Sequence, residues 1–240
     1  MMQAGNGTER RVGWRRAIAP IKQHAERMYH RVRPVVHRPA AFEQWADILL
    51  DHLQNNALPF WLEHGMDRVH GGVLSDLARG GTPAWPYRKV AHRQGRFMWS
   101  FASIHRLDPR PAYREAADHA RHYLTERMRD MQHGGYYWLT DRVGRLMDGR
   151  KHVYGHCFVI YGLAAYSRAF NDPAALEEAL ALFQLIDEHA RSPHGGYREA
   201  FTCDWGTWLR GDPMHGSIVA DRHSCFEIAV LEMLSELYEV

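Results

Sequence analysis

The sequence of 240 residues predicts an all-α protein, an α/α toroid of which the chain holds about half to two-thirds. Two observations predict this fold: a His-Gly-Gly tripeptide that recurs, and an alternation of one-sided with all-round apolar helices. A helix that is apolar all round is buried on all sides, whereas a one-sided helix covers a core. The alternation therefore describes inner and outer helices. An open α-solenoid, which also stacks helix pairs, is the alternative.

The tripeptide begins at His70, His133 and His194, at intervals of 63 and 61 residues. Paired glycines permit tight turns with positive φ. A short piece of extended character follows each copy, and a fixed period of this size indicates a repeated supersecondary unit. A closed ring of six such units would need on the order of 370 residues, so three units make about half a ring.

Two helices are expected in each repeat, the first amphipathic and the second richer in large apolar residues. The cap-like Asn171-Asp172 before Pro173 marks one helix start especially well. The periodicity predicts helices at residues 42–57, 92–106, 112–128, 153–170, 174–189 and 217–240.

The chain divides by charge into a basic N-terminal extension, residues 1–40, and a toroid domain, residues 41–240. The extension holds nine Arg or Lys residues and two acids. It lacks the apolar core of a signal peptide. A basic helical arm and a poorly ordered extension are both consistent with it.

The bulk properties indicate neither a nucleic-acid partner nor a membrane span. The net charge of +2 does not indicate a nucleic-acid partner, and no run of 18 apolar residues suggests a membrane span. Cys157, Cys203 and Cys225 have the spacing of neither a disulfide framework nor a zinc site. We therefore expect free thiols, a cytoplasmic location and no metal site.

The starts of the expected inner helices are polar and aromatic, at residues 92–96, 151–156 and 221–227. If these helices line a cavity, their starts converge at one mouth and form a wet site. Arg96, Tyr154 and Trp99 suit a sugar, because arginine and tyrosine donate to oxygens and aromatic faces pack on the apolar side of a sugar ring. Each aromatic residue alone is more often part of a core.

Five stretches of the chain resemble one enzyme family, the N-acylglucosamine 2-epimerase and cellobiose 2-epimerase family. The resemblance covers about residues 42–240, and the motifs are specific as a set. They are residues 58–61 (LPFW), 94–101 (QGRFMWSF), 133–138 (HGGYYW, followed by Asp141 and Gly144), 151–163 (KHVYGHCFVIYGL) and 194–200 (HGGYREA, followed by Asp204-Trp205).

The resemblance implies an (α/α)6 barrel that epimerises an aldose at C2, or interconverts aldose and ketose, without a cofactor. A base would remove the C2 proton, and donors would stabilise the enediolate. It implies that Arg96 holds the carbonyl or enolate oxygens, that Tyr154 contacts sugar hydroxyls and that Glu232 is the family's acid. We take these three as catalytic candidates. Trp99, His156 and His223 are candidates for substrate binding.

Two departures from the family pattern qualify this expectation. Where cellobiose-type members have a His-x-His pair, this chain has Glu227 and Ala229. The resemblance also implies that two proton-transfer histidines lie in the second half of the barrel, beyond the matched region. A half ring would also leave the apolar inner helices open to water along one side, so we expect it to associate as a homodimer or with a complementing C-terminal half.

Two other functions remain open at this stage. A non-catalytic module that binds a carbohydrate or a partner would keep Arg96, Trp99 and Tyr154 but needs no base. A glycosidase on the same toroid would need two opposed carboxylates about 5–10 Å apart. Glu199, Glu227 and Glu232 are candidates for that pair, although no pairing stands out in the sequence.

Overall fold

The computed structural model describes residues 40–193, 195–207 and 224–240. The chain divides into two units after Leu53. Helix α2 (Ala40–His52) belongs to the first unit. Residues 1–39 of the expected basic extension lie outside the described residues, and so does His223. The boundary at residue 40 stays a prediction.

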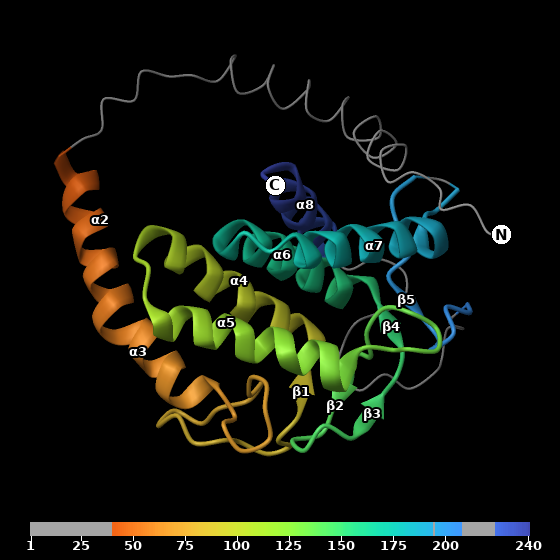
Figure 1. The fold of residues 1–240 in the computed structure, drawn as a ribbon, viewed down its shortest axis with the longest axis horizontal. Coiled ribbons are helices and arrows are strands. Elements are labelled where there is room, and N and C mark those ends of the chain that lie inside the picture. Colours follow the sequence, from red (N-terminus) through yellow and green to blue (C-terminus); the bar gives the residue numbers. More distant parts are fainter. Residues whose placement is uncertain (1–39, 194, 208–223) are drawn as a thin grey trace, which may run out of the picture. The chain divides into compact units, whose positions relative to one another are not determined.

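The second unit is predominantly helical, and its helices follow the periodicity of the sequence (Figure 1). It starts within a π-helical turn at Leu53–Ala57, and two further π-helical turns lie at Trp61–Gly65 and Leu124–Met128. The α-helices are α3 (Leu58–Phe60), α4 (Ala91–Leu107), α5 (Pro111–Tyr123), α6 (Val153–Phe170), α7 (Pro173–Ala190) and α8 (Ser224–Tyr238). Three predicted helices, 92–106, 153–170 and 174–189, are thus confirmed to within one residue at each end, while the predicted helix 112–128 becomes a π-helical turn after Tyr123. The first predicted helix gives way to π-helical turns after residue 52, and α8 is described from residue 224.

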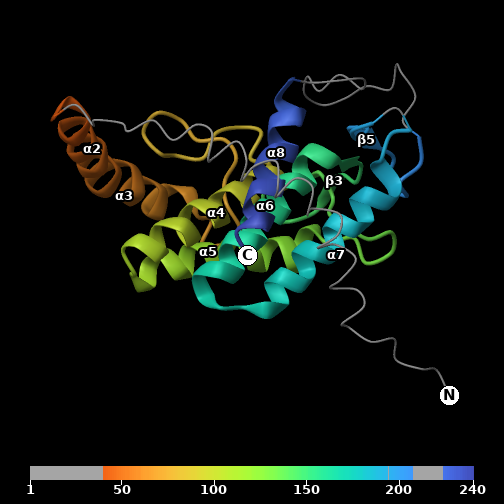
Figure 2. The same cartoon turned by 90° about the horizontal axis from the view of Figure 1, so that it is seen from above.

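The helices of this unit lie in two layers. Helix α6 packs between α4 and α8, while α5 covers α4 and α7 covers α6 (Figures 1 and 2). Most of α6 is buried, whereas α5 buries a single stripe, as the sequence pattern predicts. The start of α7 is capped as expected, because the Asp172 carboxylate accepts a hydrogen bond from the Ala175 amide at 3.0 Å.

Helices α4 and α6 touch through two glycines. A Cβ atom on Gly95 would lie 2.2 Å from the carbonyl oxygen of Phe158, and one on Gly162 would lie 2.5 Å from the carbonyl oxygen of Gly95. No side chain fits in that space, so the two inner helices cross backbone against backbone. This contact fixes how the starts of α4 and α6 lie relative to each other.

Short antiparallel strands precede both of these helices. Strand β1 (Lys89–Val90) leads into α4 and pairs with β2 (Leu139–Thr140), which pairs in turn with β3 (Leu146–Asp148). Strand β4 (Lys151–His152) leads into α6 and pairs with β5 (Ala200–Phe201). Each inner helix is therefore held at its start by the extended piece that follows the glycine turn of the next repeat.

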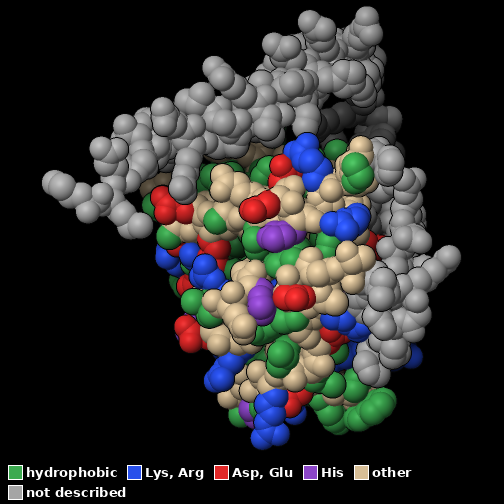
Figure 3. Space-filling view, turned by 90° about the vertical axis from the view of Figure 1, so that its right-hand side faces the viewer, with side chains coloured by type: hydrophobic (Ala, Val, Ile, Leu, Met, Phe, Trp, Pro, Cys, Tyr) green, Lys and Arg blue, Asp and Glu red, His purple; other side chains and the backbone are tan. Residues whose placement is uncertain are grey.

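The face of the molecule drawn in Figure 3 carries charges of both signs, interspersed with hydrophobic side chains and a few histidines. Among the described helices, none is both long enough and apolar enough to cross a membrane.

Candidate functional site

The glycine turns have the backbone geometry that their sequence requires. Both glycines of every copy have positive φ, so the predicted repeat of turns is confirmed. The φ angles are 77° and 70° at Gly71 and Gly72, 73° and 71° at Gly134 and Gly135, and 94° and 70° at Gly195 and Gly196.

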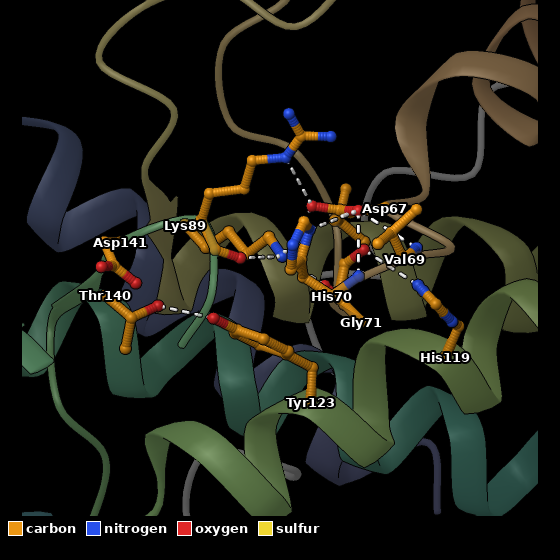
Figure 4. A network of polar contacts seen from close by, with 12 residues as sticks. Asp67, Val69, His70, Gly71, Lys89, His119, Tyr123, Thr140 and Asp141 are labelled. Carbon is orange, nitrogen blue, oxygen red and sulfur yellow. Dashed lines mark hydrogen bonds and ion pairs between the residues drawn. The ribbon is translucent and has the colours of Figure 1, made fainter. Parts of the chain in front are cut away.

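A buried ion pair ties the first turn to the start of α4 (Figure 4). The Asp67 carboxylate accepts hydrogen bonds from the backbone amides of Val69 and His70, at 3.2 and 3.1 Å. Lys89 Nζ lies 3.1 Å from the other Asp67 oxygen, and both side chains are almost fully buried. Lys89 also donates to the carbonyl oxygen of Gly71. One lysine thus fixes the turn against β1.

The second repeat contains the same buried ion pair and the same bonds to the turn amides. Asp130 accepts from the amides of Gln132 and His133, at 2.9 and 3.0 Å, and Lys151 Nζ lies 2.6 Å from its other oxygen. Burial alone would raise the pKa of Asp130, but the hydrogen bonds from Lys151 and the backbone outweigh it and hold that pKa at about 2.

The sequence reasoning missed these pairs, although the sequence carries a signal for them. Asp67 and Asp130 each lie three residues before the histidine of a His-Gly-Gly copy, and Lys89 and Lys151 each lie two residues before an inner helix. In the third repeat, Ser192, two residues before His194, makes the corresponding backbone bonds: its amide donates to the Gly196 carbonyl oxygen, and its carbonyl oxygen accepts from the Gly195 amide.

The starts of α4 and α6 form a cluster of polar and aromatic side chains. The Arg96 guanidinium lies over the Phe158 ring, with its central carbon 4.2 Å from the ring centroid. The Tyr154 ring lies 5.0 Å from Phe158, and the His92 ring lies 5.4 Å from Tyr154. Arg96 is exposed and Tyr154 is half-buried, so the cluster can be reached from solvent. The structure therefore brings these two sequence candidates together.

Trp99 lies one turn further along α4 and joins three helices. Its Nε1 donates to Glu236 of α8 at 2.9 Å, and its ring stacks on Tyr161 of α6 at 4.7 Å. Arg168 of α6 donates to the other oxygen of Glu236, also at 2.9 Å. Because the indole nitrogen is already bonded, any sugar contact by Trp99 would use the ring. The sequence analysis did not include Glu236.

Glu232 is half-buried on α8, one turn before Glu236. Burial, followed by the charges of Glu236 and Glu232, raises the pKa of Tyr161. No hydrogen bond joins Glu232 to Arg96 or Tyr154 among the described residues. The structure thus places this carboxylate near Tyr161 and does not pair it with the other two candidates.

His156 has partners within the protein for both ring nitrogens, and its predicted contact with a substrate stays a prediction. The ring is buried, its Nε2 accepts from the Tyr136 amide at 3.0 Å, and its Nδ1 donates to the His152 carbonyl oxygen at 2.7 Å in the tautomer this requires. Burial lowers the pKa of His156 to about 3, so the ring is neutral. Both nitrogens are used within the protein, and His156 anchors the second turn to α6.

Of the candidate carboxylates of the glycosidase alternative, Glu199 precedes β5, and Glu227 and Glu232 lie on α8. Glu199 is buried beside β5, where its carbonyl oxygen accepts from the Val153 amide at 2.8 Å. The side chain of Glu227 lies outside the described residues. Within the described ranges, no group of three His, Cys, Asp or Glu side chains is placed to hold a metal ion.

Paired helices in two layers, with an outer helix against each inner one, form the arrangement of an α/α toroid. The family model described as N-acylglucosamine 2-epimerase (GlcNAc 2-epimerase) matches residues 71–219, more than half of the chain. The chain belongs to this family.

Similar proteins include epimerases and an isomerase. A cellobiose 2-epimerase of Bacteroides fragilis is 35% identical over 155 residues, which are 64% of this chain and 39% of that protein. A D-mannose isomerase of Marinomonas mediterranea is 35% identical over 142 residues, which are 57% and 34% of the two chains. The solved structure of a cellobiose 2-epimerase from Spirochaeta thermophila is 34% identical, with a TM-score of 0.76, over 86% of this chain and 51% of that one.

These matches confirm the α/α toroid that the sequence predicts. The chain spans about half the length or less of the relatives that it matches. The half-ring expectation is consistent with this coverage.

Proposed function

We propose that this chain forms one half of a sugar epimerase or isomerase that reacts at C2 of an open-chain aldose without a cofactor. The family membership supports the reaction class. The observation that carries the proposal is the placement of Arg96 and Tyr154 around Phe158 at the starts of α4 and α6, where both can be reached from solvent.

The chemistry assigns a separate task to each group. The C2 proton of an aldose is weakly acidic, and its removal places negative charge on the carbonyl oxygen. The Arg96 guanidinium, already charged and only partly covered by Phe158, stabilises that oxygen in the enediolate. Tyr154 holds a sugar hydroxyl, the Trp99 ring packs on the sugar chain, and Glu232 assists proton movement from α8. Return of the proton to C2 gives the epimer, and return to C1 gives the ketose.

The base that removes the C2 proton comes from outside the described residues. A complementing C-terminal half, in the same or another chain, supplies it. The length of the matched relatives supports this, because the chain spans about half of them or less. Ile228 and Leu231 of α8 also support it, since they are 58% and 66% exposed on the last inner helix and such apolar surface favours association.

Product analysis tests the proposal. The chain alone, and the chain mixed with the separately expressed C-terminal half of the Bacteroides fragilis relative, are incubated with mannose, glucose, cellobiose and N-acetylglucosamine. We expect the mixture to form an epimer or a ketose that NMR detects, and Arg96→Ala to abolish it. Equal turnover by the Arg96→Ala protein would contradict the proposed site.

A non-catalytic carbohydrate-binding module is the second candidate, because the exposed Arg96 and the half-buried Tyr154 can bind a sugar without a base. This module would bind a sugar through Arg96 and Tyr154, and no mixture would form product.

Cys157 and Cys203 are free thiols in the structure, and the cytoplasmic location expected from the cysteine pattern stays a prediction.

A further inference from the structure

His92 lies in the first turn of α4, four residues before Arg96, so the two side chains share a face of the helix. Its ring stacks on Trp138 with a centroid distance of 5.2 Å and an interplanar angle of 20°. Its other neighbours are Tyr154, at 5.4 Å, and Phe158, at 6.4 Å. His92 therefore belongs to the cluster that holds Arg96 and Tyr154.

The imidazole of His92 is not satisfied within the protein. Its Nδ1 is buried without a hydrogen-bond partner, and no described residue bonds to either ring nitrogen. His156, on the neighbouring inner helix, has partners for both nitrogens. A buried polar group without a partner costs about 1–3 kcal/mol, and packing against Trp138 alone would be served better by a phenyl ring. This cost points to a role in which the nitrogens gain a partner.

The surroundings favour a neutral hydroxyl as that partner. Burial, followed by the charges of Arg93 and Arg96, lowers the pKa of His92 to about 3, so the ring is neutral near neutral pH. A neutral imidazole offers one donor and one acceptor, which matches a hydroxyl group that both donates and accepts. His92 is only partly buried as a residue, so part of its surface faces solvent.

We propose that His92 binds a hydroxyl of the sugar chain whose carbonyl oxygen Arg96 holds. The proposal rests on the proposed sugar site, and it extends that site by one residue from the first turn of α4. His92 acts here as a binding group that orients the sugar, and no proton transfer is assigned to it.

The substitution His92→Phe separates hydrogen bonding from packing, because phenylalanine keeps the ring against Trp138 and removes both nitrogens. Affinity for mannose, glucose and cellobiose is measured by NMR titration of the whole chain. We expect His92→Phe to bind about three- to tenfold more weakly than the wild type, with an equal or higher melting temperature because the unpartnered imidazole is removed. His92→Asn, which keeps a donor and an acceptor, recovers part of the loss.

The same substitution at His122, an exposed histidine of the outer helix α5, is the control and leaves affinity unchanged. Wild-type affinity in His92→Phe would overturn the inference and leave the proposed function standing, because Arg96→Ala reports on that function separately. Sugar binding that depends on His92, without turnover in any mixture, would support the inference while the epimerase proposal fails. A wild-type chain that binds none of the three sugars would overturn both.

Discussion

The ammonium group of Lys151 lies 2.6 Å from the Asp130 carboxylate, and neither side chain is exposed to solvent. One repeat earlier, Lys89 and Asp67 form the same buried pair. Each ion pair joins a glycine turn to the two-residue strand, β1 or β4, that directly precedes an inner helix. The inner helix starts, where Arg96 and Tyr154 lie, are thus held by charges in the interior.

Removal of one member of a buried pair leaves the other charge uncompensated. We expect Lys151→Met to lower the free energy of unfolding by about 3–5 kcal/mol, as measured by urea denaturation followed by circular dichroism. Arg68→Ala is the matched control, because Arg68 and Glu115 lie 2.7 Å apart but are well exposed. That change should cost less than about 1 kcal/mol. Equal effects of the two substitutions would show that burial does not matter here.

Acid should weaken the fold through the same carboxylates. The pKa of Asp130 and of Asp67 is about 2 in the folded chain, below the ordinary value of 3.8. The unfolded state therefore binds protons first, so the stabilisation is complete above about pH 4 and is lost as pH falls toward 2. The lysines stay protonated throughout this range.

Urea midpoints measured between pH 5 and pH 2 test this pH dependence. Asp130→Asn keeps an acceptor for the turn amides but does not titrate, so its stability should fall less steeply with acid than that of the wild type. If the urea midpoints of the two proteins fall with pH at the same rate, titration of Asp130 does not cause the loss of stability in acid.

The contact between α4 and α6 should not tolerate a methyl group. Gly95→Ala would place a Cβ atom 2.2 Å from the Phe158 carbonyl oxygen, which forces the inner helices apart. We expect a loss of about 1–3 kcal/mol of stability. Sugar binding should also weaken, because Arg96, the next residue on α4, would shift with the helix. Gly80→Ala, where nothing lies within 4 Å of the added Cβ, should be neutral in the same denaturation assay.

The exposed apolar side chains of α8 should drive association. We expect the wild-type chain to associate with itself or with a C-terminal half, and Leu231→Asp to reduce the associated mass seen by light scattering. Leu107, exposed at the end of α4, gives the control Leu107→Asp, which should have no effect. A wild-type chain that stays monomeric and binds no C-terminal half would contradict the role proposed for α8.

Local patterns predicted much of this fold. Helix α6 occupies residues 153–170, as the apolar run indicates, and the Asp172 cap lies where the sequence predicts it. The glycine turns follow from the repeat, because only positive φ closes them. Features of this kind depend on neighbours within one helical turn or one tight turn.

The features that were missed depend on distant partners. A lysine such as Lys151 is expected to be exposed, and only the fold brings Asp130, 21 residues away, into contact with it. His156 seemed free to bind a sugar because the Tyr136 amide that occupies its Nε2 lies 20 residues earlier. The π-helical turn at Leu124–Met128 has no distinctive sequence pattern. Arg96 and Tyr154 were predicted from the polar and aromatic starts of the expected inner helices, and the family resemblance gave them their proposed roles.

Hydrogen exchange at C2 tests the central claim most directly. Mannose, glucose and cellobiose are incubated in deuterated water with the chain and a complementing C-terminal half, and deuterium at C2 is measured by NMR. We expect incorporation with the wild-type chain and none with Arg96→Ala, because an enediolate that is not stabilised does not form. Incorporation that is equal in the two proteins, or absent from the wild type although it binds the sugar and the C-terminal half, would contradict the proposed chemistry.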